Sequence, residues 1–145
     1  MKKISFLILM LAAVSCSKDN CSGTELAGSY TFYSIEAFDC SNPSSNYAMS
    51  FSSANCATAH GYEYCTSGSM NFSADGTVTS TLSLKENFSG LGFGRNFNGV
   101  GTYVKNGSNI TVCVNGCSDF RIQGNRLMSE SVSSNCSGRV ELIRR

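Results

Sequence analysis

A series of short turn signals, separated by stretches that alternate apolar and polar residues, constrains the fold most. Asn106-Gly107 is the strongest of them, because both residues tolerate the positive φ of a two-residue hairpin. Asn115-Gly116-Cys117 and Gly124-Asn125 follow at hairpin spacing. Upstream, the segment 73–77 predicts a three-residue loop with Gly76 in the left-handed conformation. The pattern predicts an antiparallel meander.

Turn geometry predicts the register of these hairpins. At residues 115–117 a two-residue loop would pair Val112 with Asp119 and mix charge into the apolar face, whereas a three-residue loop pairs Val112 with Phe120. A slip of one residue reverses the faces of a strand, so we predict the three-residue loop. The predicted pairs are Phe72–Val78, Tyr103–Ile110, Gly101–Val112, Val114–Ser118, Val112–Phe120, Ile110–Ile122 and Ile122–Leu127.

Short strands with regular turn signals predict an all-β domain, and sequential hairpins favour an up-and-down antiparallel β-barrel of about eight to nine strands. One Pro, 14 Gly and few charges agree with a turn-rich β fold. The exception is the Ser/Asn/Ala-rich segment 40–68, which we expect to be a long loop stapled by cysteines. The predicted strands are 29–38, 69–73, 77–84, 90–97, 100–105, 109–114, 118–123, 126–132 and 138–143.

The N-terminus has the three-part pattern of a cleaved export signal. Lys2 and Lys3 precede an apolar stretch, residues 4–14, that is too short to span a bilayer. Residues 11–16 also resemble a bacterial lipobox, which implies diacylation of Cys16; an ordinary signal peptide is the alternative. We expect a signal peptide at 1–15, a lipidated cysteine with a polar tether at 16–24, and the barrel domain at 25–145.

The residues after Cys16 are polar and suit a tether between a lipid and a folded domain. Ser17-Lys18-Asp19-Asn20 is similar to the surface-export signal of Bacteroidetes-type lipoproteins, which implies a lipid anchor in the bacterial outer membrane with exposure at the cell surface. Removing Lys2 and Lys3 from the 11 basic residues, against 10 acidic ones, leaves a net charge of about −1. This balance excludes a basic patch for nucleic acid.

Eight cysteines in an exported chain predict a disulfide framework. With lipid on Cys16, seven remain, so we expect three bridges and one spare thiol, which we assign to Cys21 in the tether. Spacing alone leaves the pairing open. The six candidates for bridges are Cys40, Cys56, Cys65, Cys113, Cys117 and Cys136.

The order and spacing of several short motifs resemble the lipocalin-like domain of Bacteroidetes-type lipoproteins over about residues 25–143. The motifs lie at the first strand, at the predicted 73–77 loop and along the last strands. They are Leu26-Ala27-Gly28-Ser29-Tyr30, Cys65 before Phe72-x-x-Asp75-Gly76-Thr77, Gly101-Thr102-Tyr103, Asn109-Ile110-Thr111-Val112, Phe120-Arg121-Ile122-x-Gly124-Asn125-Arg126-Leu127 and Val140-Glu141-Leu142.

The resemblance implies a barrel that is plugged at one end, with Tyr30 in place of the family's tryptophan, and a ligand cavity at the other end beneath the segment 40–68. It leaves open whether the interior is hollow or filled by side chains, since eight-stranded barrels occur in both forms. The candidate ligand-binding residues are Phe32, Glu36, Phe72, Val78, Leu82, Tyr103, Ile110, Val112 and Phe120.

The direction of Glu36 depends on which face of the first strand is buried. If Tyr30 points inward, the two-residue period sends Glu36 inward too, where it would orient a polar or cationic ligand. The opposite parity buries Ile35 and leaves Glu36 in water. We favour solvent or the rim of the barrel, because carboxylates are seldom buried.

Two other motifs invite a functional interpretation. His60 lies between Cys56 and Cys65, with Cys40 as a further ligand, but oxidised cysteines are poor metal ligands, so we predict neither a metal site nor a cofactor. The glycine-rich segment 89–95 lacks the Gly-Lys-Ser/Thr ending of a phosphate-binding loop and favours a kinked strand or a barrel rim.

Two classes of function remain. A single histidine gives Ser–His or Cys–His catalysis little basis, so we do not expect an enzyme. The first hypothesis is a barrel that binds a small hydrophobic ligand. The second is a protein-interaction module, an adhesin or inhibitor, that acts through residues 40–68 and 86–98 on a filled barrel. A cavity of several hundred cubic ångströms would favour the first hypothesis.

Overall fold

The computed structural model describes residues 26–87 and 93–145, so the predicted signal peptide, the tether with Cys16 and Cys21, and residues 88–92 lie outside the described residues. Within the described part, no helix is long and apolar enough to cross a membrane. The elements are β1 (Gly28–Phe38), a 3-10 helix η2 (Pro43–Ser45), β2 (Tyr47–Ser50), β3 (Cys56–Ala59), β4 (Tyr62–Ser67), β5 (Met70–Phe72), β6 (Thr77–Asn87), β7 (Phe93–Asn106), β8 (Asn109–Cys113), β9 (Cys117–Gln123), β10 (Arg126–Val132) and β11 (Ser137–Arg144).

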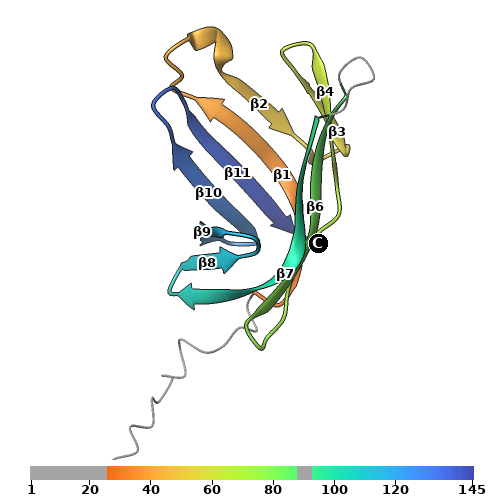
Figure 1. Ribbon diagram of the computed structural model, residues 1–145, viewed down its shortest axis with the longest axis vertical. Coiled ribbons are helices and arrows are strands. Elements are labelled where there is room, and N and C mark those ends of the chain that lie inside the picture. Colours follow the sequence, from red (N-terminus) through yellow and green to blue (C-terminus); the bar gives the residue numbers. More distant parts are fainter. Residues whose placement is uncertain (1–25, 88–92) are drawn as a thin grey trace, which may run out of the picture.

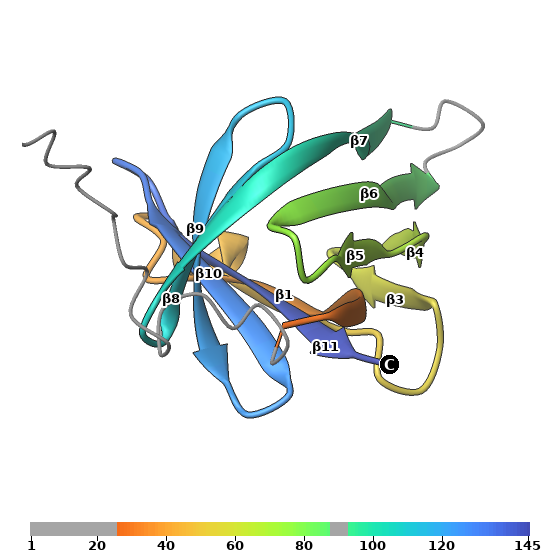
Figure 2. The same ribbon diagram turned by 90° about the horizontal axis from the view of Figure 1, so that it is seen from below.

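Eight of the strands form a closed antiparallel barrel. The order around the ring is β1, β11, β10, β9, β8, β7, β6 and β5, and the short β5 completes it by pairing with both β6 and β1 (Figure 2). β1, β10 and β11 form one wall, which faces β6 and β7 (Figure 1). The up-and-down barrel predicted from the hairpin signals is confirmed.

The segment 40–68 is not a long loop, as we expected, but adds η2 and three strands to the barrel. β2 pairs with the C-terminal half of β1, and the β3–β4 hairpin pairs with the C-terminal half of β6. The prediction was wrong because the many Ser and Asn residues obscure the aromatic and β-branched residues of β4, of which Thr66 is buried and Tyr64 half-buried. These extra strands lengthen two walls of the barrel beyond β5.

Two predicted hairpin registers are confirmed. Phe72 pairs with Val78 around the 73–77 loop, where Gly76 has a φ of 87°. The Gly124-Asn125 turn pairs Ile122 with Leu127.

Two other registers are wrong by two residues. The β7–β8 turn is centred on Gly107 and Ser108, one position later than predicted, and the β8–β9 loop comprises residues 114–116 because the Cys113–Cys117 disulfide closes it. A shift of two residues keeps each side chain on its predicted face, so the apolar face is as expected. The observed pairs are Tyr103–Val112, Val112–Ser118 and Ile110–Phe120, in place of Tyr103–Ile110, Gly101–Val112, Val114–Ser118, Val112–Phe120 and Ile110–Ile122.

Residues 93–97 of the predicted strand 90–97 and the predicted strand 100–105 are parts of one strand, β7, while residues 90–92 lie outside the described residues. It pairs with β6 along Phe93–Thr102 and with β8 along Thr102–Asn106. Where it passes from one neighbour to the other, a Cβ at Gly101 would lie 1.9 Å from the carbonyl oxygen of Cys113. Glycine therefore permits the close approach of β7 and β8 at this point.

A bulge in β1 explains why the two halves of this strand bury different sets of alternate residues. The register with β11 shifts between Phe32 and Ser34, which leaves Tyr33 as the extra residue. Before the bulge Tyr30 and Phe32 are buried, and after it Ile35 is buried. Both alternatives considered for the inward-facing residues of β1 are thus present: the set that contains Tyr30 before the bulge, and the set that contains Ile35 after it.

The end of the barrel closed by β5 is filled with side chains. Phe72 lies between two tyrosine rings, 5.3 Å from Tyr30 and 5.1 Å from Tyr103 between ring centroids, and both contacts are edge-to-face. The Tyr103 hydroxyl donates a hydrogen bond to the Ser73 carbonyl at 2.7 Å. The other buried residues of the closed end are Leu26, Val78, Ile110 and Leu127.

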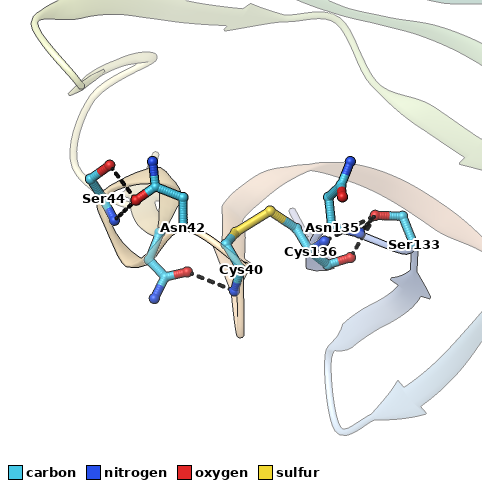
Figure 3. Close-up of a disulfide and its surroundings, with 7 residues drawn as sticks. Cys40, Asn42, Ser44, Ser133, Asn135 and Cys136 are labelled. Atoms are coloured by element: carbon cyan, nitrogen blue, oxygen red, sulfur yellow. Dashed lines mark hydrogen bonds between the residues drawn. A yellow bond between two sulfur atoms is a disulfide. The ribbon is translucent and has the colours of Figure 1, made fainter.

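The six predicted cysteines form three disulfides. Cys56–Cys65 and Cys113–Cys117 each join paired residues of a hairpin, β3–β4 and β8–β9. Cys40–Cys136 spans 96 residues and ties the segment after β1 to the β10–β11 turn (Figure 3).

Hydrogen bonds surround the Cys40–Cys136 disulfide on both sides. The Ser41 N–H donates to the Asn135 carbonyl at 2.8 Å, and the Cys136 N–H donates to the Ser133 hydroxyl at 3.1 Å. On the other side, the Asn42 side chain caps η2 by accepting from the Ser44 N–H at 3.1 Å (Figure 3). The disulfide therefore joins two ordered turns.

Candidate ligand-binding cavity

Beyond the packed closed end, the barrel contains a cavity of about 740 Å³. Its deepest part is apolar, because the lining side chains there are aromatic, aliphatic or methionine and are almost fully buried. They are Phe32, Met70, Leu82, Val112 and Leu142. The barrel is therefore filled at the closed end and hollow at the other.

We call four of the partly exposed side chains that line this cavity the cavity mouth: Tyr47, Tyr64, Glu86 and Phe97. They come from β2, β4, β6 and β7, so the added strands of the segment 40–68 supply two of the four. Tyr64 and Glu86 are paired residues of the β4–β6 ladder, and their side chains lie on the same face. Phe97 is 43% exposed although it lines the cavity, which places it at the boundary with solvent.

The environment of Tyr64 favours its neutral phenol. Burial raises the pKa of Tyr64, and the nearby Glu86 carboxylate raises this pKa further, with smaller contributions from Tyr47 and Tyr62. The mouth therefore presents neutral aromatic rings beside a carboxylate. Among the described residues that line the cavity, Glu86 alone carries a formal charge at neutral pH.

A second concavity lies on strands β7 to β10. β9 and β10 pair only from Gln123 back to Arg121 on β9, so their ladder is short. A groove of about 570 Å³ lies there, lined by polar residues that include Asp119 and Glu130. Phe120 lines both this groove and the cavity and is the side chain between them.

The predicted ligand-binding residues divide into three groups. Glu36 lies on the outer face of the barrel, where its carboxylate is 3.3 Å from the Arg139 guanidinium. This position agrees with the solvent-facing alternative. Phe72, Val78, Tyr103 and Ile110 pack the closed end and do not line the cavity, while Phe32, Leu82, Val112 and Phe120 line it.

The cysteines near His60 are not available as thiolate ligands. Cys56 and Cys65 lie close to Glu63, but they are joined to each other, and Cys40 is joined to Cys136. His60 occupies the β3–β4 turn with a φ of 50°, and its ring contacts the Tyr47 ring edge-to-face at 5.6 Å between centroids. Its observed contact is therefore with a residue of the mouth.

The sequence contained signals for the mouth residues that our predictions missed. Glu86 continues the alternation of Val78, Leu82 and Leu84 by one more step of two residues, so a longer strand would have placed it inward. Tyr64 lies in an aromatic and β-branched stretch typical of a strand. Tyr47 had no comparable signal, because β2 has only four residues.

No protein-family model, curated protein or solved structure matches this chain. The disulfide-stapled antiparallel barrel is established by the structure, and the lipocalin-like identity stays a prediction from the sequence motifs. The cavity and the residues at its mouth are the observations that bear on function.

Proposed function

We propose that the protein is a lipid-anchored envelope lipoprotein whose lipocalin-like barrel binds a small apolar ligand. The single observation that carries the binding proposal is the cavity of about 740 Å³. Small-molecule sites usually have volumes of about 300–1,000 Å³ and are mainly apolar, with a few polar groups that orient the ligand. The deep residues and the mouth fit this description.

The proposed anchor rests on the sequence of the first 20 residues. A charged start, a short apolar stretch and a cysteine followed by polar residues support export and lipidation at Cys16. Leu26 enters the barrel at the closed end, where it is 1% exposed. The described part of the chain therefore begins at the end of the barrel opposite the mouth, and the proposed anchor would join it there.

The alternative function is a protein-interaction module that uses the loops of a filled barrel. The cavity weighs against this alternative, because the half of the barrel that carries β2, β3 and β4 is not filled. An absence of any bound small molecule would reverse this preference.

Native mass spectrometry of the oxidised mature protein carrying Cys16→Ser, incubated with an envelope lipid extract, tests the proposal. We expect one ligand per protein, identified by its mass. A bare protein after incubation with the complete extract would contradict small-ligand binding and favour a protein partner.

A variant that fills the cavity tests where the ligand lies. Leu84 lines the cavity, so Leu84→Trp places a larger ring inside it and should abolish the adduct. Val100→Trp is the matched control, because Val100 is 75% exposed on the neighbouring strand β7 and does not line the cavity. Equal adducts in both variants would place the ligand elsewhere. Circular dichroism and unfolding curves show whether both variants are folded.

A further inference from the structure

The charge and the aromatic rings at the mouth restrict the chemistry of the ligand. This inference rests on the proposed function, since it concerns the headgroup of a molecule held in the same cavity. A ligand whose apolar body fills the deep part leaves its polar end at the mouth, beside Tyr47, Tyr64 and Glu86. The polar end must then suit two neutral aromatic rings and one carboxylate.

We propose that the ligand carries a positively charged amine or quaternary ammonium group on its apolar body, and that Glu86, Tyr64 and Tyr47 hold this group. Aromatic faces attract cations through the negative potential above the ring, and quaternary ammonium groups are bound in this way by aromatic residues. A carboxylate beside the rings adds direct charge attraction, which is stronger in a partly desolvated mouth than in bulk water.

Ligands of other charge fit the mouth less well. An anionic headgroup would lie against the Glu86 carboxylate, and like charges in a partly buried site repel. A neutral headgroup would cover Glu86 without pairing it, which leaves a charged group desolvated at a free-energy cost. A cationic headgroup, by contrast, offsets the burial of this carboxylate.

Charged side chains on the outer face beside the mouth do not reverse this conclusion. Lys85 and Glu63 are exposed, and each is adjacent in sequence to a mouth residue, so the alternation of a strand directs them to the outer face. Arg139 and Arg126 are also on the outer face, where Arg139 pairs with Glu36 and Glu130, and Arg126 with Glu141.

The test compares three twelve-carbon probes that share one chain and differ in headgroup charge: dodecyltrimethylammonium, dodecanol and dodecanoate. Binding to the oxidised mature protein carrying Cys16→Ser is measured by calorimetry below the concentration at which the probes form micelles. We expect the ammonium probe to bind at least about tenfold more tightly than dodecanoate. Added salt should weaken binding of the ammonium probe more than that of dodecanol.

Four substitutions assign the effect to the mouth. Glu86→Gln should weaken binding of the ammonium probe about tenfold, whereas Glu63→Gln, which removes the same charge from the neighbouring outer face, should leave it unchanged. Tyr64→Leu should weaken it, and Tyr64→Phe should not, since the aromatic ring rather than the hydroxyl attracts the cation.

The outcomes separate this inference from the proposed function. If all three probes bind equally well, or if Glu86→Gln has no effect, the cavity binds apolar molecules but the headgroup inference is wrong. Tighter binding of dodecanoate would also overturn it, and Arg95, whose backbone pairs with Leu84, would then be the first residue to substitute. If no probe binds, both the inference and the cavity-binding proposal fail.

Discussion

At the scale of single residues, Tyr103 joins two parts of the closed end. Its ring packs edge-to-face on Phe72, and its hydroxyl donates to the Ser73 carbonyl at 2.7 Å, in the turn that follows β5. The residue is 7% exposed, so the hydrogen bond is shielded from water. Tyr103 thereby fixes the β5–β6 turn against β7.

Tyr103→Phe should lower the free energy of unfolding by about 1 kcal/mol, because the ring contacts remain while the Ser73 carbonyl loses its side-chain donor. Tyr103→Leu should lower it further, since the aromatic contact is lost as well. Urea unfolding at neutral pH measures both values. Equal stability of the Phe variant and the parent protein would show that the hydrogen bond contributes nothing.

The buried tyrosines also predict how stability depends on pH. Burial raises the pKa of Tyr30 and of Tyr103 above the ordinary value of 10.0, and for Tyr103 the Asp75 carboxylate adds to the effect. The folded state therefore retains these protons longer than the unfolded state does. The stability they contribute is fully present below about pH 10 and is lost as the pH rises through the raised pKa values.

Urea unfolding midpoints between pH 8 and 12 test this prediction. The midpoint should fall above about pH 10, and it should fall less steeply for Tyr103→Phe, which lacks one of the titrating groups. A Tyr103→Phe profile parallel to that of the parent protein would assign alkaline unfolding to other groups.

At the scale of elements, β7 bends at a glycine that the ladder requires. The strand exchanges β6 for β8 as its neighbour around Thr102, and the adjacent Gly101 is too close to the Cys113 carbonyl for any side chain. This contact is with backbone, so the neighbour cannot rotate away. β7 therefore runs from Phe97 at the mouth to Tyr103 at the closed end and exchanges its neighbour near the closed end.

Gly101→Ala should lower the free energy of unfolding by about 3 kcal/mol or more, because the β7–β8 ladder must move apart. Gly107→Ala is the matched control. Gly107 has a φ of 60°, and a Cβ added there would have no neighbouring atom within 4 Å, so alanine should cost only about 1 kcal/mol. Similar losses in both variants, measured by urea unfolding, would show that β7 adapts to a side chain at residue 101.

The elements also show which features the sequence predicts and which it does not. Alternation and turn residues are local properties, so most strand positions outside the segment 40–68 were predictable, and so was the inward face of β8 to β10. Register across a disulfide-closed loop, such as Cys113–Cys117, depends on a pairing that spacing alone does not determine. In β1 the set of inward-facing residues changes at Tyr33 because of a bulge there. No turn residue at this position marks the bulge in the sequence.

The candidate site was predictable only in part, for a related reason. Phe32, Leu82, Val112 and Phe120 follow from strand alternation. The depth of the packed end depends on how side chains from opposite walls fill the barrel. Phe72, which lies between the rings of Tyr30 and Tyr103, is an example. Side-chain filling is a property of the tertiary structure and not of any single strand.

At the scale of the whole molecule, the three disulfides differ mainly in the length of chain they close. Cys40–Cys136 spans 96 residues, whereas Cys113–Cys117 spans four. In the chain-entropy description, a disulfide stabilises the fold by restricting the unfolded chain, and longer loops give larger effects. The long-range bridge should therefore contribute most to stability.

Replacing Cys40 and Cys136 together by serine should lower the free energy of unfolding by about 4.7 kcal/mol, against about 2 kcal/mol for the same replacement of Cys113 and Cys117. Guanidinium unfolding without reductant measures both. The order of the two losses is the test, and a larger loss from the short bridge would show that local strain or contacts outweigh chain entropy.

The pairing of β1 with β11 has a further consequence for how the chain acquires its fold. The ladder joins Tyr30 to Arg144, so the barrel depends on contacts between the two most distant described strands. Such high contact order slows folding. A chain that emerges with its N-terminus first holds β1 without this partner until residues 137–144 are released, and the barrel cannot be completed before then. Delayed closure of this kind would suit the proposed export, since a polypeptide must stay unfolded while it is threaded through a translocation channel.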